Sequence, residues 1–139
     1  MLDMLFSGAS ALAAIGWLLL IGLPRHRGAQ LVAGVGVPLA ISTLYLALIA
    51  VYFPNAKGGF GSLADVSLLF SERAVLLAGW VHYLAFDLFI GAWEVRDAQK
   101  HTIPHLLVVP CLFLTFMLGP IGLLTYFALR TMRAGPVAV

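Results

Sequence analysis

The chain has few charged residues and a single cysteine. Asp, Glu, Lys and Arg make up 10% of its 139 residues, whereas about 25% is usual in a soluble domain. With 62% apolar residues, a domain of this size cannot bury its hydrophobic surface against itself. Cys111 alone cannot form an internal disulfide or a thiolate-only metal site, and packing is its expected role. These shortages exclude the soluble globular and the disordered classes.

The sequence also lacks the patterns of several binding and enzyme classes. A net charge of +2 is too small and its residues too scattered to predict nucleic-acid binding. Four histidines are too few for a membrane di-iron centre, and no H-E-x-x-H, G-x-S-x-G or phosphate-binding glycine motif occurs. A bis-histidine haem is not expected, because His82 and His105 would differ in depth by more than about 10 Å. We therefore expect no metal and no cofactor.

What the sequence does contain is a set of long, charge-poor windows. A hydrocarbon core about 30 Å thick requires roughly 20 helical residues. Such windows occur at about 4–23, 29–53, 72–95 and 103–129. Strands are not expected, because no alternating ten-residue pattern is present. The sequence predicts an all-α integral membrane bundle of four transmembrane helices, forming a single domain over residues 1–139.

Two flanking features refine this picture. The segment 54–71 is the longest non-apolar stretch, and its remaining apolar residues predict a loop that rests on the membrane surface. The first window does not resemble a signal peptide, because Asp3 replaces the basic leader. Arg25 and Arg27 stand where small cleavage-site residues would be expected.

Small residues and prolines predict how the helices pack. Ala13 and Gly34 belong to small-residue spacings that allow close helix approach and indicate a compact bundle. Pro38, Pro110 and Pro120 each remove one helix hydrogen bond, so we expect kinks in the second and fourth helices.

Orientation is judged from the basic residues in the short loops. With four crossings, the first and third hairpins carry Arg25, Arg27, Arg96 and Lys100. The opposite side carries Lys57, Arg73, Arg130 and Arg133. The counts are equal, but the first helix has no basic residue before it and two after it. This asymmetry favours both termini outside.

The third window is the most informative, because ionisable groups inside a membrane are costly and usually face protein or a polar cavity. At about 100° per residue, one face of this helix is centred on Asp87. It also holds Trp80, Tyr83, Gly91 and Glu94. The opposite side carries His82, with Phe86 and Trp93. Any site that uses both Asp87 and His82 must therefore be closed by other helices.

Each polar residue has a structural interpretation beside the functional one. A lone carboxyl group at Asp87 is either functional or an interhelical anchor, and function is favoured. His82 is equally well explained as a hydrogen-bonded core residue or as a functional group. For Asp97 we expect a solvated turn with surface ion pairs. His101 and His105 are expected to be interfacial polar residues rather than metal ligands, because a proline interrupts their helical spacing.

A family resemblance rests on motifs in the second half of the chain. Residues 79–93 read GWVHYLAFDLFIGAW, followed by IPH at 103–105, VPCL at 109–112 and LGPIGLL at 118–124. Taken in order, these motifs resemble the abscisic-acid-deficient-four-like family over residues 79–126, whereas the first two helices resemble it in hydropathy only. The family consists of small four-helix membrane proteins. Its plant members act in neoxanthin synthesis from violaxanthin, and its bacterial relatives are largely without assigned function. No long plastid-targeting extension is present, so the resemblance implies a bacterial inner-membrane protein or a mature plastid one.

The resemblance implies chemistry on a carotenoid end group. Conversion of an epoxide into an allenic alcohol changes no oxidation state, and it requires acid assistance at the oxygen and removal of a proton from the polyene. Asp87 is the better acid candidate, because an apolar environment disfavours the charged carboxylate. The base remains open among His82, Glu94 and His105.

The aromatic residues of the third helix could form flat walls for a polyene, although packing and interfacial anchoring explain them equally well. They are Trp80, Tyr83, Phe86, Phe89 and Trp93. The leading hypothesis is a carotenoid-modifying or isomerising membrane protein with a site between the third and fourth helices. A groove facing lipid or a dimer interface is expected, because a monomer of this size has little interior for a long pigment.

Two other functions are kept beside this hypothesis. The alternative is a non-catalytic carotenoid- or lipid-binding subunit of a larger membrane complex. A transporter is the third interpretation, and it is weakened because the first half of the chain contains no counterpart of the charged third helix. The expected partners are membrane lipids and a carotenoid or similar apolar ligand, with a homo-oligomer or a membrane complex as the assembly.

Overall fold

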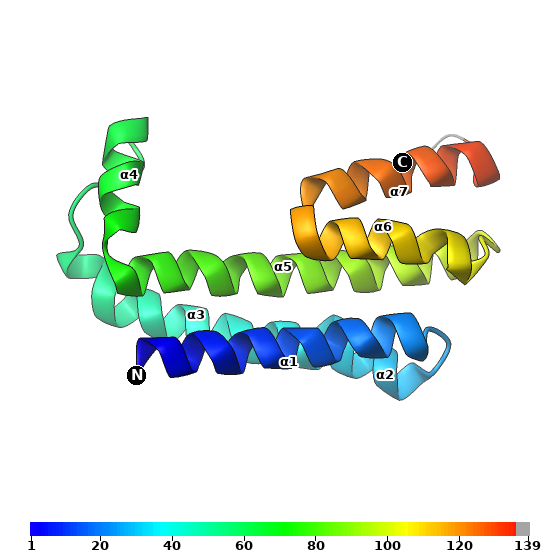
Figure 1. Cartoon of the computed structure of the whole chain (residues 1–139), viewed down its shortest axis with the longest axis horizontal. Coiled ribbons are helices and arrows are strands. Elements are labelled where there is room, and N and C mark those ends of the chain that lie inside the picture. The colour runs from blue at the N-terminus through cyan, green and yellow to red at the C-terminus, as the bar shows by residue number, and fades with distance from the viewer. Residues whose placement is uncertain (136–139) are drawn as a thin grey trace.

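Three long helical segments run side by side along the length of the molecule (Figure 1). They are α1 (Leu2–Gly22), the run of α2 (Arg27–Leu31), η1 (Val32–Gly36) and α3 (Val37–Tyr52), and α5 (Arg73–Lys100). The computed structural model describes residues 1–135, and no strand occurs within that range. The all-α prediction is therefore confirmed.

Three of the expected spans correspond to helices of suitable length. By length and composition, Leu2–Gly22, Arg27–Asn55 and Arg73–Lys100 are apolar enough to cross a membrane, which is compatible with a membrane protein. The third helix continues five residues beyond the predicted end at Val95. Asp87 consequently lies near the middle of α5.

The expected fourth span, 103–129, is divided in two in the structure. α6 (His105–Leu118) ends at Gly119, and α7 (Pro120–Ala134) begins directly after it. Gly119 has a φ of +45°, which residues other than glycine rarely adopt. Pro120 occupies the first turn of α7, where its missing N–H is tolerated. The chain therefore reverses where the sequence predicted only a kink, and the four-span prediction is not confirmed.

The two halves of this hairpin pack closely. A Cβ atom on Gly122 of α7 would collide with the backbone and hydroxyl of Thr115 in α6. Pro110 lies inside α6, which continues through it as one helix. Both helices lie along the same part of α5 (Figure 1). We refer to α6 and α7 together as the α6–α7 hairpin.

The second long segment is irregular just before Pro38. A π-helical turn, Val32–Gly36, precedes it, and Val37 N donates to Val32 O across that turn. Wider turns of this kind relieve the missing hydrogen bond of a nearby proline. The turn also meets α5 closely, because a Cβ atom on Gly34 would lie 2.9 Å from the Cβ atom of Ala92. The predicted close approach through a small residue is thus confirmed at Gly34.

The segment 54–71 contains a helix where a loop was expected. α4 (Leu63–Ser71) stands across one end of α5 (Figure 1), after the short η2 (Phe53–Asn55). The hydroxyl of Ser62 caps α4 by accepting a hydrogen bond from Asp65 N at 3.1 Å. Phe60 and Leu63 are exposed, whereas Leu69 is buried.

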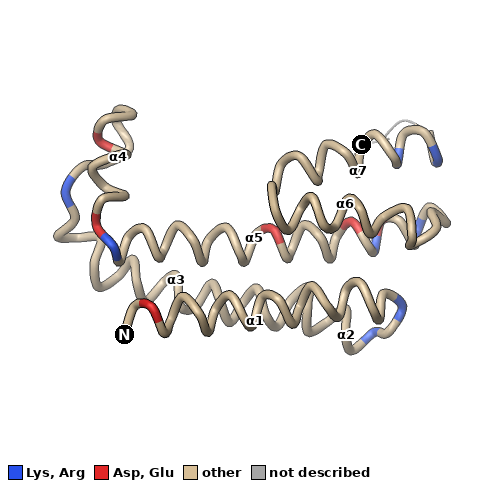
Figure 2. Tube along the Cα trace, in the orientation of Figure 1, with Lys and Arg blue, Asp and Glu red and all other residues tan. Residues whose placement is uncertain are grey.

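Lys and Arg residues gather at the ends of the long helices, whereas α5 also carries acidic residues along its length (Figure 2). Because the chain reverses at Gly119, α7 returns to the end of α5 that holds Asp97, where Arg130 Nε donates to Asp97 Oδ2 at 2.8 Å. The assignment of Arg130 and Arg133 to the side of Lys57 and Arg73 was therefore wrong. One end carries Lys57 and Arg73. The other carries Arg25, Arg27, Arg96, Lys100, Arg130 and Arg133.

Candidate functional site

The α6–α7 hairpin covers one half of α5 and leaves the other half open. Contacts with the hairpin extend along α5 from Asp97 to Tyr83, whose hydroxyl donates to Phe116 O at 2.8 Å. Next to the remaining half lies a groove of about 730 Å³. We call residues 84–100 the covered half of α5 and residues 73–83 the open half. Polar groups occur in both halves, but in different surroundings.

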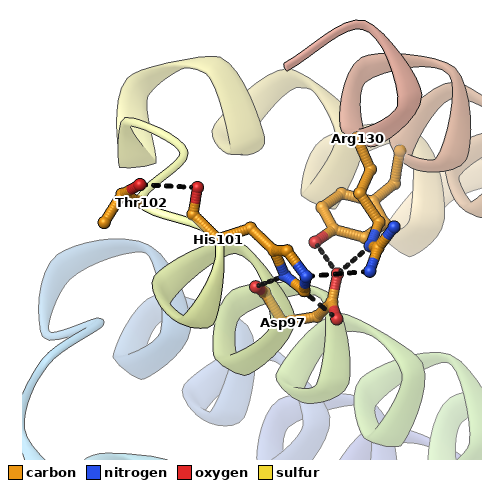
Figure 3. A network of polar contacts seen from close by, with 5 residues as sticks. Asp97, His101, Thr102 and Arg130 are labelled. Atoms are coloured by element: carbon orange, nitrogen blue, oxygen red, sulfur yellow. Dashed lines mark hydrogen bonds and ion pairs between the residues drawn. The ribbon is translucent and has the colours of Figure 1, made fainter. Parts of the chain in front are cut away.

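At the end of the covered half, a polar cluster joins α5 to α7 (Figure 3). Asp97 Oδ2 accepts hydrogen bonds from Tyr126 Oη at 2.7 Å and from Arg130 Nε at 2.8 Å. The side chains of Asp97 and Arg130 are only 14% and 9% exposed. The surface ion pair in a solvated turn that the sequence predicted is therefore a largely buried one.

His101 completes this cluster. Its Nε2 atom lies 2.9 Å from Arg130 Nη2, and Nδ1 lies 2.9 Å from Asp97 O (Figure 3). A guanidinium group can only donate and a carbonyl can only accept. In this arrangement Nε2 accepts from Arg130 and Nδ1 donates to the Asp97 carbonyl. His101 therefore links the end of α5 to α7 through Arg130.

Further along the covered half, Glu94 is completely enclosed. The Thr115 hydroxyl of α6 can donate to either carboxylate oxygen, at 2.9 Å to Oε1 and 3.2 Å to Oε2. Both side chains have no exposed surface. A carboxyl group with so few partners is costly to bury, and its enclosure keeps Glu94 away from the groove.

Asp87 lies at the tip of the α6–α7 hairpin. Its two carboxylate oxygens are 3.1 and 3.2 Å from where a Cβ atom on Gly119 would be, so only glycine fits comfortably against it. Oδ2 of Asp87 is buried and has no hydrogen-bond partner within the described part of the chain. Buried polar atoms are normally paired, and exceptions often mark functional sites. Asp87 is thus the one predicted catalytic residue with an unexplained buried oxygen.

The groove beside the open half is mostly apolar and aromatic. The ring of Phe6 lies 5.4 Å from that of Trp80, which lies 5.5 Å from that of Tyr83. Trp80 Nε1 donates to Ser10 Oγ at 3.1 Å, which fixes the indole against α1. The groove is lined by Leu2, Asp3, Phe6, Phe70, Arg73, Leu76, Leu77, Gly79, Trp80, His82, Tyr83 and Met117.

His82 and Tyr83 line the groove from different faces of α5. The His82 ring packs against Tyr45 and Phe86, with centroid distances of 5.8 and 4.6 Å. His82 is exposed rather than part of a hydrogen-bonded core. Asp87 instead faces Gly119. The prediction that Asp87 and His82 lie on different faces is confirmed, and of the two only His82 is among the residues that line the groove.

The other predicted site residues lie elsewhere. His105 Nε2 donates to Ile21 O at 3.0 Å at the start of α6, whereas Asp87 lies beyond the end of that helix, about 20 Å away by helix rise. Phe86 and Phe89 border a separate hollow of about 210 Å³ next to α3. Trp93 packs on Tyr126, with centroids 5.6 Å apart, under the hairpin. Of the five predicted aromatic residues, Trp80 and Tyr83 line the groove.

Several important residues were missed in the sequence. Thr115, Gly119, Tyr126 and Arg130 make the contacts that close the covered half. The consecutive glycine and proline at 119–120 were the available signal, because that pair is typical of turns. Among residues 1–135, no group of His, Cys, Asp and Glu side chains is arranged to hold a metal ion.

Comparisons with known proteins identify one family. A family model described as ABA DEFICIENT 4-like matches residues 4–126. This match covers most of the chain, including the first two helices, which the motif resemblance did not reach. No curated protein and no solved structure matches the chain.

Proposed function

The chain belongs to the ABA DEFICIENT 4-like family, and from this premise we propose that it is a multi-pass membrane protein that modifies a carotenoid end group by acid–base chemistry. The observation that carries the proposal is the unpartnered, buried Oδ2 atom of Asp87 at the hairpin tip. Next to it, Tyr83 forms the end of an aromatic groove. The proposed proton donor therefore lies near the inner end of a groove that suits an apolar polyene.

The proposed membrane arrangement has three crossings and one re-entrant hairpin. α1, the segment Arg27–Asn55 and α5 cross the bilayer, and α4 lies on one surface. The hairpin enters from the opposite surface and turns at Gly119, near the bilayer centre. Asp87 is fourteen residues from Arg73 and thirteen from Lys100, which puts it at the middle of α5. Protein covers Oδ2 of this carboxyl group, and the residue as a whole is half-buried.

We propose that the end with six basic residues faces the cytoplasm and the end with two faces outward. The N-terminus is then outside, as the sequence suggested, whereas the end of α7 is inside. Cys111 is buried, so a Cys111→Ala chain gives a cysteine-free background. Gly59→Cys should react with an impermeant maleimide added to intact cells, and Lys100→Cys should not. The reverse labelling pattern would contradict this orientation.

The proposed reaction needs two groups and no net redox change. The Asp87 carboxyl group, in its neutral form, donates a proton to the epoxide oxygen as the carbon–oxygen bond breaks. A base removes a proton from the adjacent polyene carbon, and the electron pair of that C–H bond forms the allenic double bond. Among the three base candidates, position favours His82, which lines the groove. Glu94 is enclosed and His105 lies at the far end of α6.

The test is pigment analysis in a host that makes an epoxy-carotenoid. Expression of the native chain should convert part of that pigment into its allenic isomer. Asp87→Asn should reduce the product at least tenfold, because the amide cannot supply the proton, and His82→Gln should reduce it similarly. Asp65→Asn, on the exposed first turn of α4, is the matched control and should retain native conversion. Unchanged pigments with the native chain across several epoxy-carotenoid backgrounds would rule out the catalytic role.

A binding role without catalysis is the second candidate. The observation that favours it is that Asp87 is not among the groove-lining residues. The purified protein would then carry unmodified pigment, and Asp87→Asn would lower its thermal stability without changing pigment composition. Pigment bound to the native protein in its converted form would exclude this role.

A further inference from the structure

Two adjoining hollows lie at the end of the molecule opposite the groove. There the turn between α1 and α2 meets the turn between α5 and α6 (Figure 1). The hollows have volumes of about 480 and 430 Å³, and Pro24, Arg25 and His105 line both of them. No acidic residue of the described part of the chain lines either one. We call the two hollows together the basic recess.

The positive charge of Arg25 is not matched by an acidic side chain. Among residues 1–135, no ion pair involves Arg25, which is exposed. The acidic side chains at this end of α5 are engaged by the α6–α7 hairpin, because Asp97 pairs with Arg130 and Glu94 accepts from Thr115. A guanidinium group can bind two oxygens of one phosphate through parallel N–H bonds. Arg25 is therefore available to an anion in the recess.

The backbone next to Arg25 is held from two sides. Pro24 O accepts hydrogen bonds from Gln30 Nε2 at 2.8 Å and from Gln99 Nε2. These two amide groups tie the turn to α2 and to α5. Binding is weakened when it must first order mobile segments. Since this turn is already fixed, a ligand of Arg25 would need to order only the side chain.

Two imidazole rings add nitrogen atoms to the recess. His26 Nδ1 accepts from Ala29 N at 3.1 Å, so the neutral ring carries its proton on Nε2 and can donate it to a ligand. His105 Nε2 donates to Ile21 O at 3.0 Å, and its Nδ1 atom has no hydrogen-bond partner within residues 1–135. In the protonated ring, Nδ1 is a further donor. These groups suit a phosphate, whose oxygens accept hydrogen bonds.

Apolar side chains beside the recess suit an acyl chain. Leu23, which lines one of the hollows, is exposed. Leu106, directly after His105, is exposed as well. A free phosphate ion gains nothing from such residues. A phospholipid can place its phosphate in a basic pocket between helices and its acyl chains on the apolar surface next to it.

From these contacts we infer that the basic recess binds the phosphate group of an anionic phospholipid, with Arg25 as its main partner. The acyl chains lie against Leu23 and Leu106. The recess is lined by α5 residues from Val95 onward, whereas the groove is lined by α5 residues up to Tyr83. The inference therefore concerns a second site and goes beyond the proposed carotenoid chemistry.

The test compares two lipids that differ only in their head groups. Purified full-length protein in dodecyl maltoside is incubated with equimolar phosphatidylglycerol and phosphatidylcholine that carry the same acyl chains. It is then passed through gel filtration and extracted for mass spectrometry. We expect about a fivefold preference for phosphatidylglycerol, as one arginine near a lipid head group provides. Equal retention of both lipids would overturn the anionic class. Loss of the preference in excess inorganic phosphate would overturn the lipid source and assign the recess to free phosphate.

Two arginine variants locate the bound lipid. Arg25→Gln should remove most of the preference, because it deletes the guanidinium group. Arg27→Gln is the matched control, since it removes the same charge from an exposed position outside both hollows and should retain the native preference. An equal loss in both variants would show that the overall charge of this end selects the lipid, and would overturn the site. Pigment conversion is a separate readout, so a chain that converts pigment without preferring phosphatidylglycerol would refute this inference alone.

Discussion

The covered and open halves of α5 belong to one continuous helix, yet their charged side chains differ in burial and in hydrogen bonding. In the covered half, Glu94 is fully buried and Asp97 nearly so, and each accepts hydrogen bonds from the α6–α7 hairpin. In the open half, Arg73 pairs with Asp3 at the exposed end, and the remaining wall is largely aromatic and aliphatic. The difference is made by the hairpin, which supplies donors to one half and ends before the other.

The covered half contributes to the stability of the fold, and the open half leaves room for a ligand. A buried carboxylate is tolerated only with partners, so the covered half depends on a specific set of contacts. An exposed ion pair contributes little, so the open half depends on apolar packing. Asp87 lies close to the boundary between the two halves. Its Oδ2 atom is buried, as carboxylates are in the covered half, but has no hydrogen-bond partner within the described part of the chain.

The largest effect is expected from breaking the buried ion pair. Arg130→Met removes the charged partner of Asp97. The Asp97 carboxylate, which is only 14% exposed, is then left without a positive charge beside it. Removing one member of a buried pair costs about 3–5 kcal/mol. The thermal midpoint of the purified protein should fall, and limited proteolysis should cut α7 early.

The double variant Asp97→Leu/Arg130→Met tests the cause of that loss. Replacing both members with apolar groups avoids the stranded charge, so the double variant should be more stable than Arg130→Met alone. A double variant that is less stable than the single one would contradict this account.

A smaller effect is expected at the boundary. Gly119→Ala adds a methyl group 3.1 Å from Asp87 Oδ1 and forces a positive φ on alanine, which costs roughly 1–2 kcal/mol for the backbone alone. Gly8→Ala is the control, because nothing lies within 4 Å of its added Cβ atom. Chemical denaturation in detergent should separate the two variants. Equal stabilities would show that the hairpin tip does not need glycine.

The smallest effect is expected at the outer end of the open half. Asp3→Asn removes an ion pair with a nitrogen–oxygen distance of 2.9 Å, almost the same as the 2.8 Å between Asp97 and Arg130. The side chains are 73% and 86% exposed, and solvent screens such pairs strongly. Its thermal midpoint should match that of the native protein. A loss comparable to that of Arg130→Met would remove the distinction between the two halves.

The helical spans were predictable because hydropathy reports composition directly. The long charge-poor windows of α1 and α5 correspond to helices in the structure. Hydropathy does not report direction, however, and the apolar window 103–129 is as compatible with two short helices as with one long helix. The reversal depends on the backbone of Gly119 and on its close contact with Asp87, and neither is visible in residue composition.

The unpredicted reversal at Gly119 also limited what could be predicted about the site. Asp87 was identified because a lone carboxyl group in an apolar helix is unusual whatever surrounds it. Asp97 was assigned to a solvated turn with surface ion pairs, and a straight fourth helix would have placed Arg130 at the opposite end of the molecule. Its actual partner became apparent only from the path of the chain.

In the proposed membrane arrangement, the re-entrant hairpin also limits how a ligand can reach the protein. A groove that ends at the bilayer centre exchanges molecules with a single monolayer, and in the proposed orientation this is the outer one. A ligand made in the inner monolayer must first cross to the other side before it can bind. The rate of that transbilayer movement, rather than the total amount of ligand in the membrane, would then set how often the groove is occupied.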